Sequence, residues 1–422
     1  MFKQYFNKFM TKNIPKECTF ARKLLRYKMN KGLIALAFGG LAIGMTEFTM
    51  MGILPDIAKD LKIEIPVAAN LIAFYALGVV VGAPTLVAFS SKYSPKSVLL
   101  FLMLLFFIFN GLFAISPDYN TLLLTRFVSG LPHGAFFGVG SVVAANLAKK
   151  GKEAQAISVM FTGMTIANLA GVPIGTYIGH HFSWRITYAI ISSLGLLTFL
   201  TLSIWLPRLK ANKDSNILSQ ISYFKRWYSW LIIAIISIGT GGLFAWISYI
   251  APLVTKVSGL DPDRVPYIMV LVGLGMFFGN LLGGKLADSI LPTKASIASF
   301  AAMAVCLVIL FFVSHIDWLA YVMAFITGMI SFTIGPCLQM MLINNAKGAE
   351  TFAAAAGQAA FNIGNTFGAF FGAIPITTGL AYNYPSLVGA GMASIGALLT
   401  FVFLKTYVLK KKDVAEKSEI IA

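Results

Sequence analysis

Apolar stretches long enough to cross a lipid bilayer recur along this chain from residue 32 almost to its C-terminus. An α-helix needs about 20 apolar residues to span a hydrocarbon core of ~30 Å. Lipid offers no partners to the backbone, so long apolar segments cross it as helices. The chain is 58% hydrophobic and only 12% charged, whereas about a quarter of the residues of a soluble protein are charged. The sequence therefore predicts an all-α integral membrane protein.

Twelve such segments can be placed from the hydropathy and length of each apolar run. Several are longer than a perpendicular helix requires, which is typical of tilted or kinked helices. We expect twelve transmembrane helices at about 32–56, 67–90, 97–116, 119–147, 154–181, 185–206, 227–255, 264–288, 293–314, 317–345, 350–379 and 386–409.

The basic residues are distributed unevenly over the connections between these segments. Of the 33 Lys and Arg residues, 27 fall on the side that carries both termini and the central loop, five fall on the other side, and Arg126 lies inside the membrane. The positive-inside rule places both termini in the cytoplasm. The net charge of +17 thus reflects membrane topology, and we expect no nucleic-acid partner.

The second half of the chain repeats features of the first at an offset of about 195 residues. Gly130 matches Gly328, Pro55 matches Pro252, and the Asn168 segment matches the Asn362 segment. These matches indicate two six-helix halves with pseudo-symmetry. We expect a basic N-terminal tail at 1–31, the first half at 32–206, a central cytoplasmic loop at 207–226, the second half at 227–409 and a C-terminal tail at 410–422.

Three ionisable side chains lie inside the membrane, where such groups are costly and mark function. Glu47 lies 15 residues into the first span and Arg126 seven residues into the fourth, so at 1.5 Å per residue both reach a similar depth. We hypothesise that they face each other and couple proton movement to transport; the alternative is a static ion pair. His133, two helical turns after Arg126, either shares a proton relay or hydrogen-bonds in its neutral form.

The spans of the second half carry polar and aromatic side chains but almost no charge. Amides and aromatic rings suit a neutral hydroxylated or amphipathic substrate, although hydrogen bonds between helices explain any one of them equally well. The candidates for the substrate cavity are Trp246, Tyr249, Gln339, Gln358, Asn362 and Asn365.

Several motifs resemble those of the major facilitator superfamily, specifically its drug:proton antiporter group and the AraJ-type sugar-efflux members. The similarity runs from about Met29 to the end of the twelfth span. It is carried by residues 44–48, 75–84, 126–140, 167–176, 182–185, 244–249, 345–348 and 379–384.

The resemblance implies the major facilitator fold, with a substrate site near the midplane between two halves, and adds Tyr75 and His133 to the cavity. It implies an antiporter motif in the fifth span (Gly163, Asn168, Gly171, Pro173 and Gly175) and a gating loop at Gly284 and Asp288. The gating motif of the first half departs from the family, because Ser90-Ser91-Lys92 replaces the usual aspartate.

Small residues recur every four positions in the fifth span, at 163, 167, 171, 175 and 179, and in the eighth span, at 275, 279 and 283. Such spacing allows helices to pack backbone to backbone. The family fold pairs these two spans across the halves, so we expect the glycines to form a sliding seam there. Tight packing without motion is the alternative.

The resemblance implies a proton-coupled exporter of a small solute in the bacterial inner membrane. We expect a sugar or sugar-like substrate, with a multidrug or chloramphenicol-type antiporter as the runner-up. A transport-inactive membrane sensor is a remote alternative. We find no catalytic or phosphate-binding motif, so no enzyme is expected. Three scattered cysteines suggest neither a metal site nor a disulfide framework. We expect the proton gradient to drive transport, no cofactor to be needed and the protein to be a monomer.

The N-terminal extension is expected to be dispensable. Residues 1–28 are basic and contain no apolar run that could insert, so they are either an artefact of an upstream start or an arm attracted to anionic lipid. Deletion of residues 2–28 should leave membrane insertion and transport unchanged. Loss of either in the truncated protein would contradict this expectation.

Overall fold

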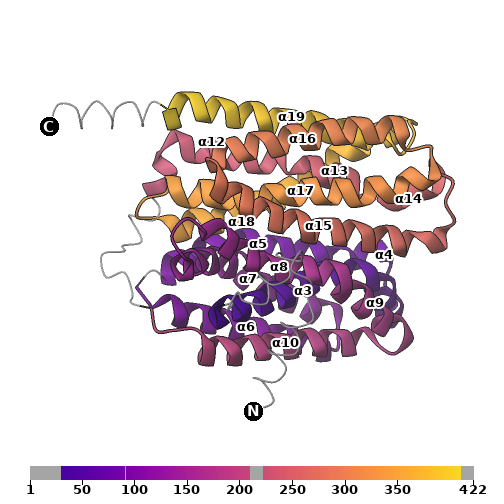
Figure 1. The fold of residues 1–422 in the computed structure, drawn as a ribbon. Coiled ribbons are helices and arrows are strands. Elements are labelled where there is room, and N and C mark those ends of the chain that lie inside the picture. The colour runs from indigo at the N-terminus through magenta and orange to yellow at the C-terminus, as the bar shows by residue number, and fades with distance from the viewer. Residues whose placement is uncertain (1–29, 91, 210–221, 410–422) are drawn as a thin grey trace, which may run out of the picture.

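The structure is a computed structural model that describes residues 30–90, 92–209 and 222–409. Nearly all of the expected N-terminal tail, much of the central loop and the C-terminal tail lie outside these residues. The described chain is helical, and its helices lie side by side in two bundles, one formed by the first half and one by the second (Figure 1). The exact domain boundaries stay predictions.

The first bundle contains six long rods of helix. Two of them are interrupted or preceded by short elements, as described below. Its elements are α3 (Lys31–Leu61), α4 (Ile65–Ala68), α5 (Asn70–Ser90), α6 (Pro95–Ile115), α7 (Tyr119–Leu147), α8 (Glu153–Ile166), η1 (Ala167–Gly171), α9 (Val172–His181) and α10 (Trp184–Trp205).

The second bundle repeats this arrangement after the short η2 (Ser222–Lys225). Its first rod is broken into three pieces. Its elements are α12 (Trp227–Gly239), α13 (Gly241–Ile247), α14 (Ile250–Lys256), η3 (Pro262–Arg264), α15 (Val265–Ser289), α16 (Pro292–Val313), α17 (Asp317–Asn345), α18 (Glu350–Thr377), α19 (Tyr384–Phe403) and η4 (Leu404–Leu409).

Eleven helices within the described residues are long and apolar enough to cross a membrane. The twelfth long rod, α18, has the length but not the hydropathy, because Gln358, Asn362 and Asn365 dilute its alanines. The twelve expected spans are therefore found, and the most polar of them lies on the boundary between the two halves, where α18 packs against α5 and α7.

The fifth rod contains a π turn that the sequence analysis missed. The turn spans Ala167–Gly171 and is closed by a hydrogen bond from Val172 N–H to the Ala167 carbonyl. Pro173 lies two residues after the turn, and its nitrogen has no hydrogen to donate to the carbonyl four residues earlier. A π turn widens the helix there and accommodates the proline.

The internal repeat predicted from the sequence recurs in the closest helix contacts. Gly78 and Gly82 of α5 lie against backbone carbonyls of α7, and Gly275 and Gly279 of α15 lie against those of α17. A Cβ atom at any of these positions would clash with backbone atoms of the neighbouring helix, and the two helices would have to move apart. The two bundles therefore share one packing plan.

The expected role of the four-residue glycine repeats is wrong. Gly163, Gly171, Gly175 and Gly179 face α3 within the first bundle, where they meet Ala37, Met45, Thr49 and Ile53. Gly275, Gly279 and Gly283 face α17 within the second bundle. The periodicity identified which face packs closely, but it could not identify the partner. These glycines hold each half together and do not form the seam between halves.

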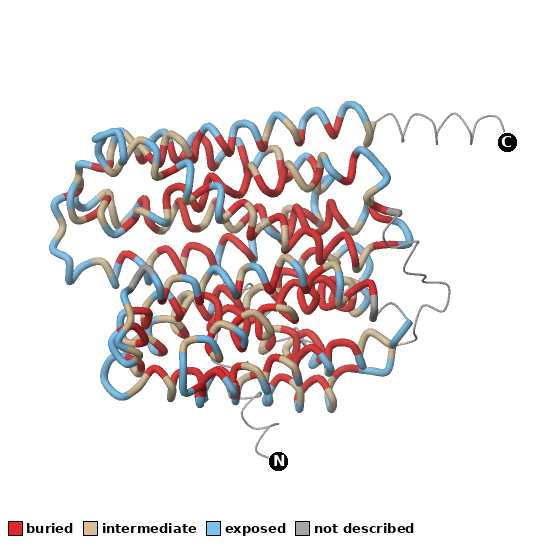
Figure 2. The backbone as a smooth tube through the Cα atoms, turned by 180° about the vertical axis from the view of Figure 1, so that it is seen from behind, coloured by how far each residue is buried: buried red, intermediate tan, exposed pale blue. Residues whose placement is uncertain are grey.

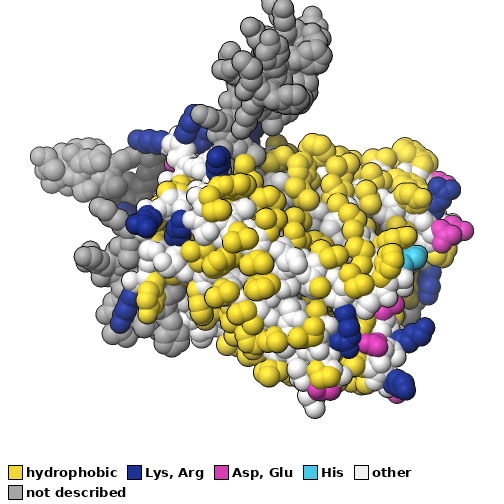
Figure 3. Space-filling view, turned by 90° about the horizontal axis from the view of Figure 1, so that it is seen from below, with side chains coloured by type: hydrophobic (Ala, Val, Ile, Leu, Met, Phe, Trp, Pro, Cys, Tyr) yellow, Lys and Arg dark blue, Asp and Glu magenta, His cyan; other side chains and the backbone are white. Residues whose placement is uncertain are grey.

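Exposure and charge follow the expectations for a membrane protein. Buried residues fill the interior of both bundles, and exposed residues gather at the two ends and along the outer faces (Figure 2). A hydrophobic belt covers the middle of the first bundle (Figure 3). We call the end with Lys96, Lys149, Lys150, Lys285 and Lys347 the basic end; the far end carries Asp56, Asp60, Asp118 and Asp261 together with a few basic residues.

Candidate functional site

Arg126 is fully buried at the centre of the first bundle and joins several of its helices. Nη1 donates hydrogen bonds to the carbonyl and the hydroxyl of Thr46, at 3.2 Å each, and to the Tyr188 hydroxyl at 3.3 Å. Nε donates to the Leu71 carbonyl at 3.3 Å. The guanidinium also lies 4.2 Å from the centre of the Tyr75 ring. A buried charge needs such compensation.

The arginine site includes residues that the sequence analysis did not single out. Thr46 donates its own hydrogen to Asn110 Oδ1 at 2.6 Å, and Asn110 is held by the Phe106 carbonyl at 2.8 Å. Asn110 is the one amide in the strongly apolar α6, which was a usable signal. Tyr188 lies near a helix start, where an aromatic side chain reads as an interfacial anchor.

Glu47 is buried next to Thr46 on α3, with 9% of its surface exposed. Among the described residues Glu47 forms no side-chain hydrogen bond, and it takes part in neither of the ion pairs His180–Asp56 and Arg185–Asp60. Glu47 and Arg126 thus form neither a hydrogen bond nor an ion pair with each other in the described chain. Arg126 Nη2 remains buried without a hydrogen-bond partner in the described chain. Their joint role stays a prediction.

Tyr75 links the arginine site to His133. The Tyr75 hydroxyl and His133 Nδ1 are 3.1 Å apart, and both side chains are almost completely buried. The His133 ring also contacts Phe137, which is stacked on Phe161 at 4.8 Å between ring centres. Aromatic contacts therefore connect the arginine site, through Tyr75 and His133, to Phe137 and Phe161 near the boundary with the second half.

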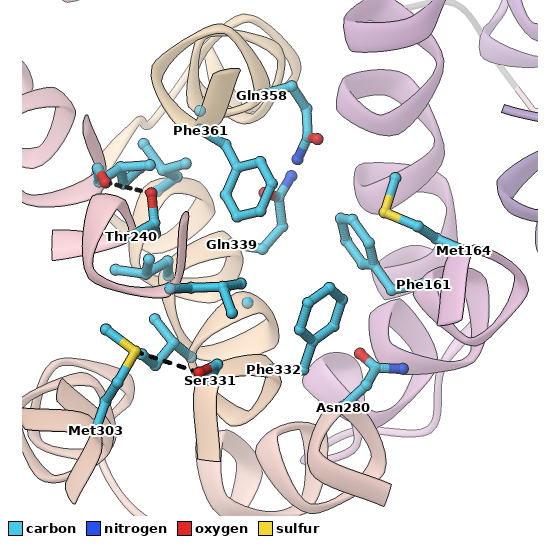
Figure 4. Close-up of a pocket in the computed structure, with 17 residues that line it drawn as sticks. Phe161, Met164, Thr240, Asn280, Met303, Ser331, Phe332, Gln339, Gln358 and Phe361 are labelled. Atoms are coloured by element: carbon cyan, nitrogen blue, oxygen red, sulfur yellow. Dashed lines mark hydrogen bonds between the residues drawn. The ribbon is translucent and has the colours of Figure 1, made fainter. Parts of the chain in front are cut away.

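A cavity lies on that boundary, lined by α8 from one half and by α12, α13, α15, α16, α17 and α18 from the other (Figure 4). Its volume of about 70 Å³ is room for several water molecules, each needing about 10–15 Å³. Phe161, Phe332 and Phe361 present aromatic rings to it. None of its lining residues is charged. Its polar lining residues are Thr240, Asn280, Ser331, Gln339 and Gln358.

Two of the predicted cavity residues, Gln339 and Gln358, line this cavity. Trp246 lines a separate small apolar cavity within the second half. Tyr249 donates to the Ala369 carbonyl at 2.7 Å, and Asn362 donates to the Gln358 carbonyl at 3.0 Å. Both bonds go to backbone carbonyls and are structural, which agrees with the alternative that these side chains form hydrogen bonds within the helical bundle. Asn365 is half-buried on α18.

Polar contacts join the two halves near the basic end. Gln339 Nε2 donates to Ser141 Oγ at 2.9 Å, across 198 residues of sequence. Ser158 Oγ donates to the Asn280 carbonyl at 2.7 Å. Gly284 lies against Ser158 and Ala154 so closely that a methyl group there would require a shift. We call the α8–α15 contact formed by Ala154, Ser158, Asn280 and Gly284 the seam; it pairs the fifth and eighth spans as expected.

Asp288 closes the seam at its outermost turn. Its two carboxylate oxygens accept hydrogen bonds from the backbone N–H groups of Ala154 and Gln155, at 2.8 and 2.9 Å. These groups begin α8, whose own N-cap residue, Lys152, supplies no side-chain cap. A carboxylate at a helix N-terminus is favoured by the unpaired donors and by the helix dipole. The second half therefore caps a helix of the first.

Asp288→Asn should weaken this cap and shift the protein toward conformations open at the basic end. The loss of a charge at a helix N-terminus is worth about 1 kcal/mol, or roughly fivefold in the equilibrium. A cysteine placed at Gln155 should then react about fivefold faster with a membrane-impermeant maleimide. Lys285→Gln, an exposed neutralisation three residues away, is the matched control. Equal labelling rates in both variants would contradict the cap.

Comparison with known proteins identifies the chain. Residues 36–373 match the family described as Major Facilitator Superfamily. The chain belongs to this superfamily. The superfamily match covers most of both helical bundles, including the arginine site, the cavity and the seam.

Curated relatives within the superfamily are similar over nearly their whole lengths. The putative transporter AraJ of Escherichia coli (strain K12) is 40% identical over 375 residues, covering 88% of this chain and 95% of that protein. The inner membrane transport protein YdhP of the same strain is 36% identical over 376 residues, covering 89% and 96%. A probable sugar efflux transporter of Helicobacter acinonychis (strain Sheeba) is 29% identical over 360 residues, covering 85% and 91%.

Solved superfamily structures share the fold. The proton:xylose symporter XylE has a TM-score of 0.70 at 16% identity, over 90% of this chain and 95% of that one. The human organic anion transporter MFSD10 has a TM-score of 0.69 at 14% identity, over 88% and 99%. The predicted fold class and the AraJ-type resemblance are confirmed. The protein is a multi-pass membrane transporter and not an enzyme.

Proposed function

We propose that the protein is a proton-coupled exporter of a small neutral solute, a sugar or sugar-like compound, in the bacterial inner membrane. The observation that carries the proposal is the separation of two sites. A buried carboxylate and a buried arginine lie within the first half, and an uncharged cavity lies between the halves. One site suits protons and the other a neutral solute.

The arginine site supports proton coupling. Glu47 forms no hydrogen bond or ion pair in the described chain, and Arg126 Nη2 has no hydrogen-bond partner there, so a deprotonated Glu47 has a vacant donor to approach. Burial disfavours the charged form of a carboxylate, and a guanidinium nearby favours it. A small movement of Glu47 toward or away from Arg126 therefore changes its affinity for a proton. The proton gradient supplies the energy, and no cofactor is required.

The distribution of contacts supports alternating access. The seam joins the halves near the basic end, whereas α9, beyond the π turn, packs mainly against α3 and α10 of its own half. With both termini in the cytoplasm, as the positive-inside rule indicates, this conformation is closed to the cytoplasm. The opposite state requires release of the Asp288 cap and of the Ser141–Gln339 bond. The monomer contains all of these groups.

The cavity supports a neutral substrate with both polar and apolar surface. Amides bind hydroxyl groups, and phenyl rings pack against the apolar faces of a sugar ring or an aromatic group. Relatives named as sugar efflux transporters favour the sugar. The many apolar lining residues, among them Met164, Leu243, Met303 and Leu338, favour a neutral drug, which is the second candidate function.

Proton movement in proteoliposomes tests the proposal. The purified full chain is reconstituted with a pH-sensitive dye inside, and a panel of pentoses, hexoses and neutral drugs such as chloramphenicol is added. We expect one or more sugars to drive protons across the membrane, which is measured as a change in the pH reported by the dye. Proton release by drugs alone would favour the runner-up, and no substrate-dependent proton movement would refute the coupled transporter.

A further inference from the structure

Asn280 is a buried amide that lines the central cavity from α15 and also belongs to the seam. Only 1% of its surface is exposed. Nδ2 donates to the Ser158 carbonyl at 2.7 Å and lies 3.2 Å from the Thr162 hydroxyl. Both partners belong to α8 of the other half. The sequence analysis did not single out Asn280, because one amide in a long apolar span has many structural explanations.

The orientation of this amide is fixed by the chemistry of its partners. A backbone carbonyl can only accept a hydrogen bond. The Thr162 hydroxyl gives its own hydrogen to the Ser158 carbonyl at 2.9 Å, so toward Asn280 it can only accept as well. Two acceptors on α8 therefore require the nitrogen of Asn280 on their side. Figure 4 shows the Asn280 oxygen on the side of Phe332, which also lines the cavity.

Gln339 provides a useful contrast. Its Nε2 donates to Ser141 Oγ, but a serine hydroxyl can accept or donate, so the Gln339 amide can turn over and keep a hydrogen bond. The Thr240 hydroxyl donates its hydrogen to the Ile236 carbonyl, and the Ser331 hydroxyl donates its hydrogen to the Met303 sulfur. Of these two cavity-lining amides that bond across the halves, Asn280 alone offers an oxygen that cannot be exchanged for a nitrogen.

We propose that Asn280 is a specificity-determining residue that accepts a hydrogen bond from the substrate and so selects ligands carrying a hydroxyl or N–H donor there. The inference rests on the proposed function, because it assumes that the central cavity is the substrate site. It adds the polarity of one contact: the substrate donates and the protein accepts.

The same geometry makes the contact depend on conformation. α8 imposes the orientation of Asn280 only while α8 and α15 are packed together. When the seam opens, the amide loses both partners and can rotate. A ligand that donates to Asn280 then binds the two conformations with different affinity, and such a difference is what allows a ligand to shift a conformational equilibrium.

Deoxyfluoro sugars test the proposal, because fluorine replaces a hydroxyl with little change in size and cannot donate. The probes are phenyl β-D-glucoside and its four mono-deoxyfluoro analogues, with binding to the full chain in nanodiscs measured by equilibrium dialysis. At least one analogue should bind about tenfold more weakly than the parent, the effect of one lost hydrogen bond. In Asn280→Leu, that analogue and the parent should bind equally, as in a double-mutant cycle.

Ser158→Ala is the matched control. It removes the seam bond to the Asn280 backbone but keeps the Ser158 carbonyl that orients the amide, so the tenfold discrimination should remain. If Asn280→Leu does not fold, Asn280→Ala replaces it.

The proposal is overturned if no analogue binds more weakly than the parent to the wild type, if the parent does not bind at millimolar concentration, or if the discrimination survives in both Asn280 variants. A protein that shows the expected binding pattern but moves no protons would refute proton coupling and leave the role of Asn280 intact.

Discussion

Glu47→Gln is expected to abolish proton-driven accumulation of substrate while leaving substrate binding and substrate exchange in place. Glutamine keeps the size of the side chain and resembles the protonated carboxyl group, with one acceptor and one donor group, but it cannot release a proton. Since Glu47 forms no hydrogen bond or ion pair within the described residues, the fold should lose less than about 1 kcal/mol. Coupled accumulation should fall to the passive level, and counterflow of labelled substrate should continue. Both are measured in the same proteoliposomes.

Glu64→Gln is the matched control for this variant. It makes the same chemical change at an exposed position near the far end, and it should accumulate substrate normally. Full coupled transport by Glu47→Gln would remove Glu47 from the mechanism.

Arg126→Ala is expected to affect both stability and coupling. The guanidinium makes four hydrogen bonds to Thr46, Leu71 and Tyr188 and packs on Tyr75. Hydrogen bonds within membrane proteins are worth about 0.6 kcal/mol each on average, and the ring contact adds about 1 kcal/mol. We therefore expect a loss of about 2–4 kcal/mol, seen as a lower thermal midpoint in detergent. Proton-driven accumulation should also fail.

The double variant separates the two effects. Coupling lost through one shared step cannot be lost twice, so Glu47→Gln with Arg126→Ala should transport no worse than either single variant. Stability should behave differently, because the hydrogen bonds of Arg126 go to other residues and Glu47 forms none in the described chain. The thermal shifts should therefore add. Arg126→Lys keeps the charge but loses the planar fork, and partial coupling is expected. Additive transport losses, or normal coupling in Arg126→Ala, would show that the two residues act independently.

The fold of this protein follows from its sequence to a large extent, because lipid restricts the alternatives. Each long apolar run has to become a helix. The distribution of lysines and arginines assigns successive connections to alternate sides of the membrane. Even the two-fold repeat was visible in residues such as Gly130 and Gly328, which occupy equivalent close contacts in the two bundles. The break of the seventh rod before Pro252 was a smaller feature that hydropathy does not report.

The site was only partly accessible from the sequence. Charge inside the membrane pointed to Glu47 and Arg126, but it could not show that Arg126 bonds to Thr46 and Tyr188 rather than to the carboxylate. The glycine repeats predicted which face of each helix packs closely but not which helix packs against it. Asn280 owes its role to an orientation imposed from α8, more than 110 residues earlier, and no local pattern contains that information.

The π turn at Ala167–Gly171 keeps the glycine repeat of the fifth rod in phase with α3. Every four-residue step along a straight α-helix rotates the side chain by about 40°, so Gly179 would lie about 160° around the axis from Gly163. The wider turn takes up one additional residue and recovers about 100° of that drift. A single-residue deletion between positions 167 and 171 would therefore convert the π turn into a regular α turn and leave Gly175 and Gly179 against Thr49 and Ile53. A single-residue insertion there would instead rotate α9 by about 100° and turn both glycines away from α3.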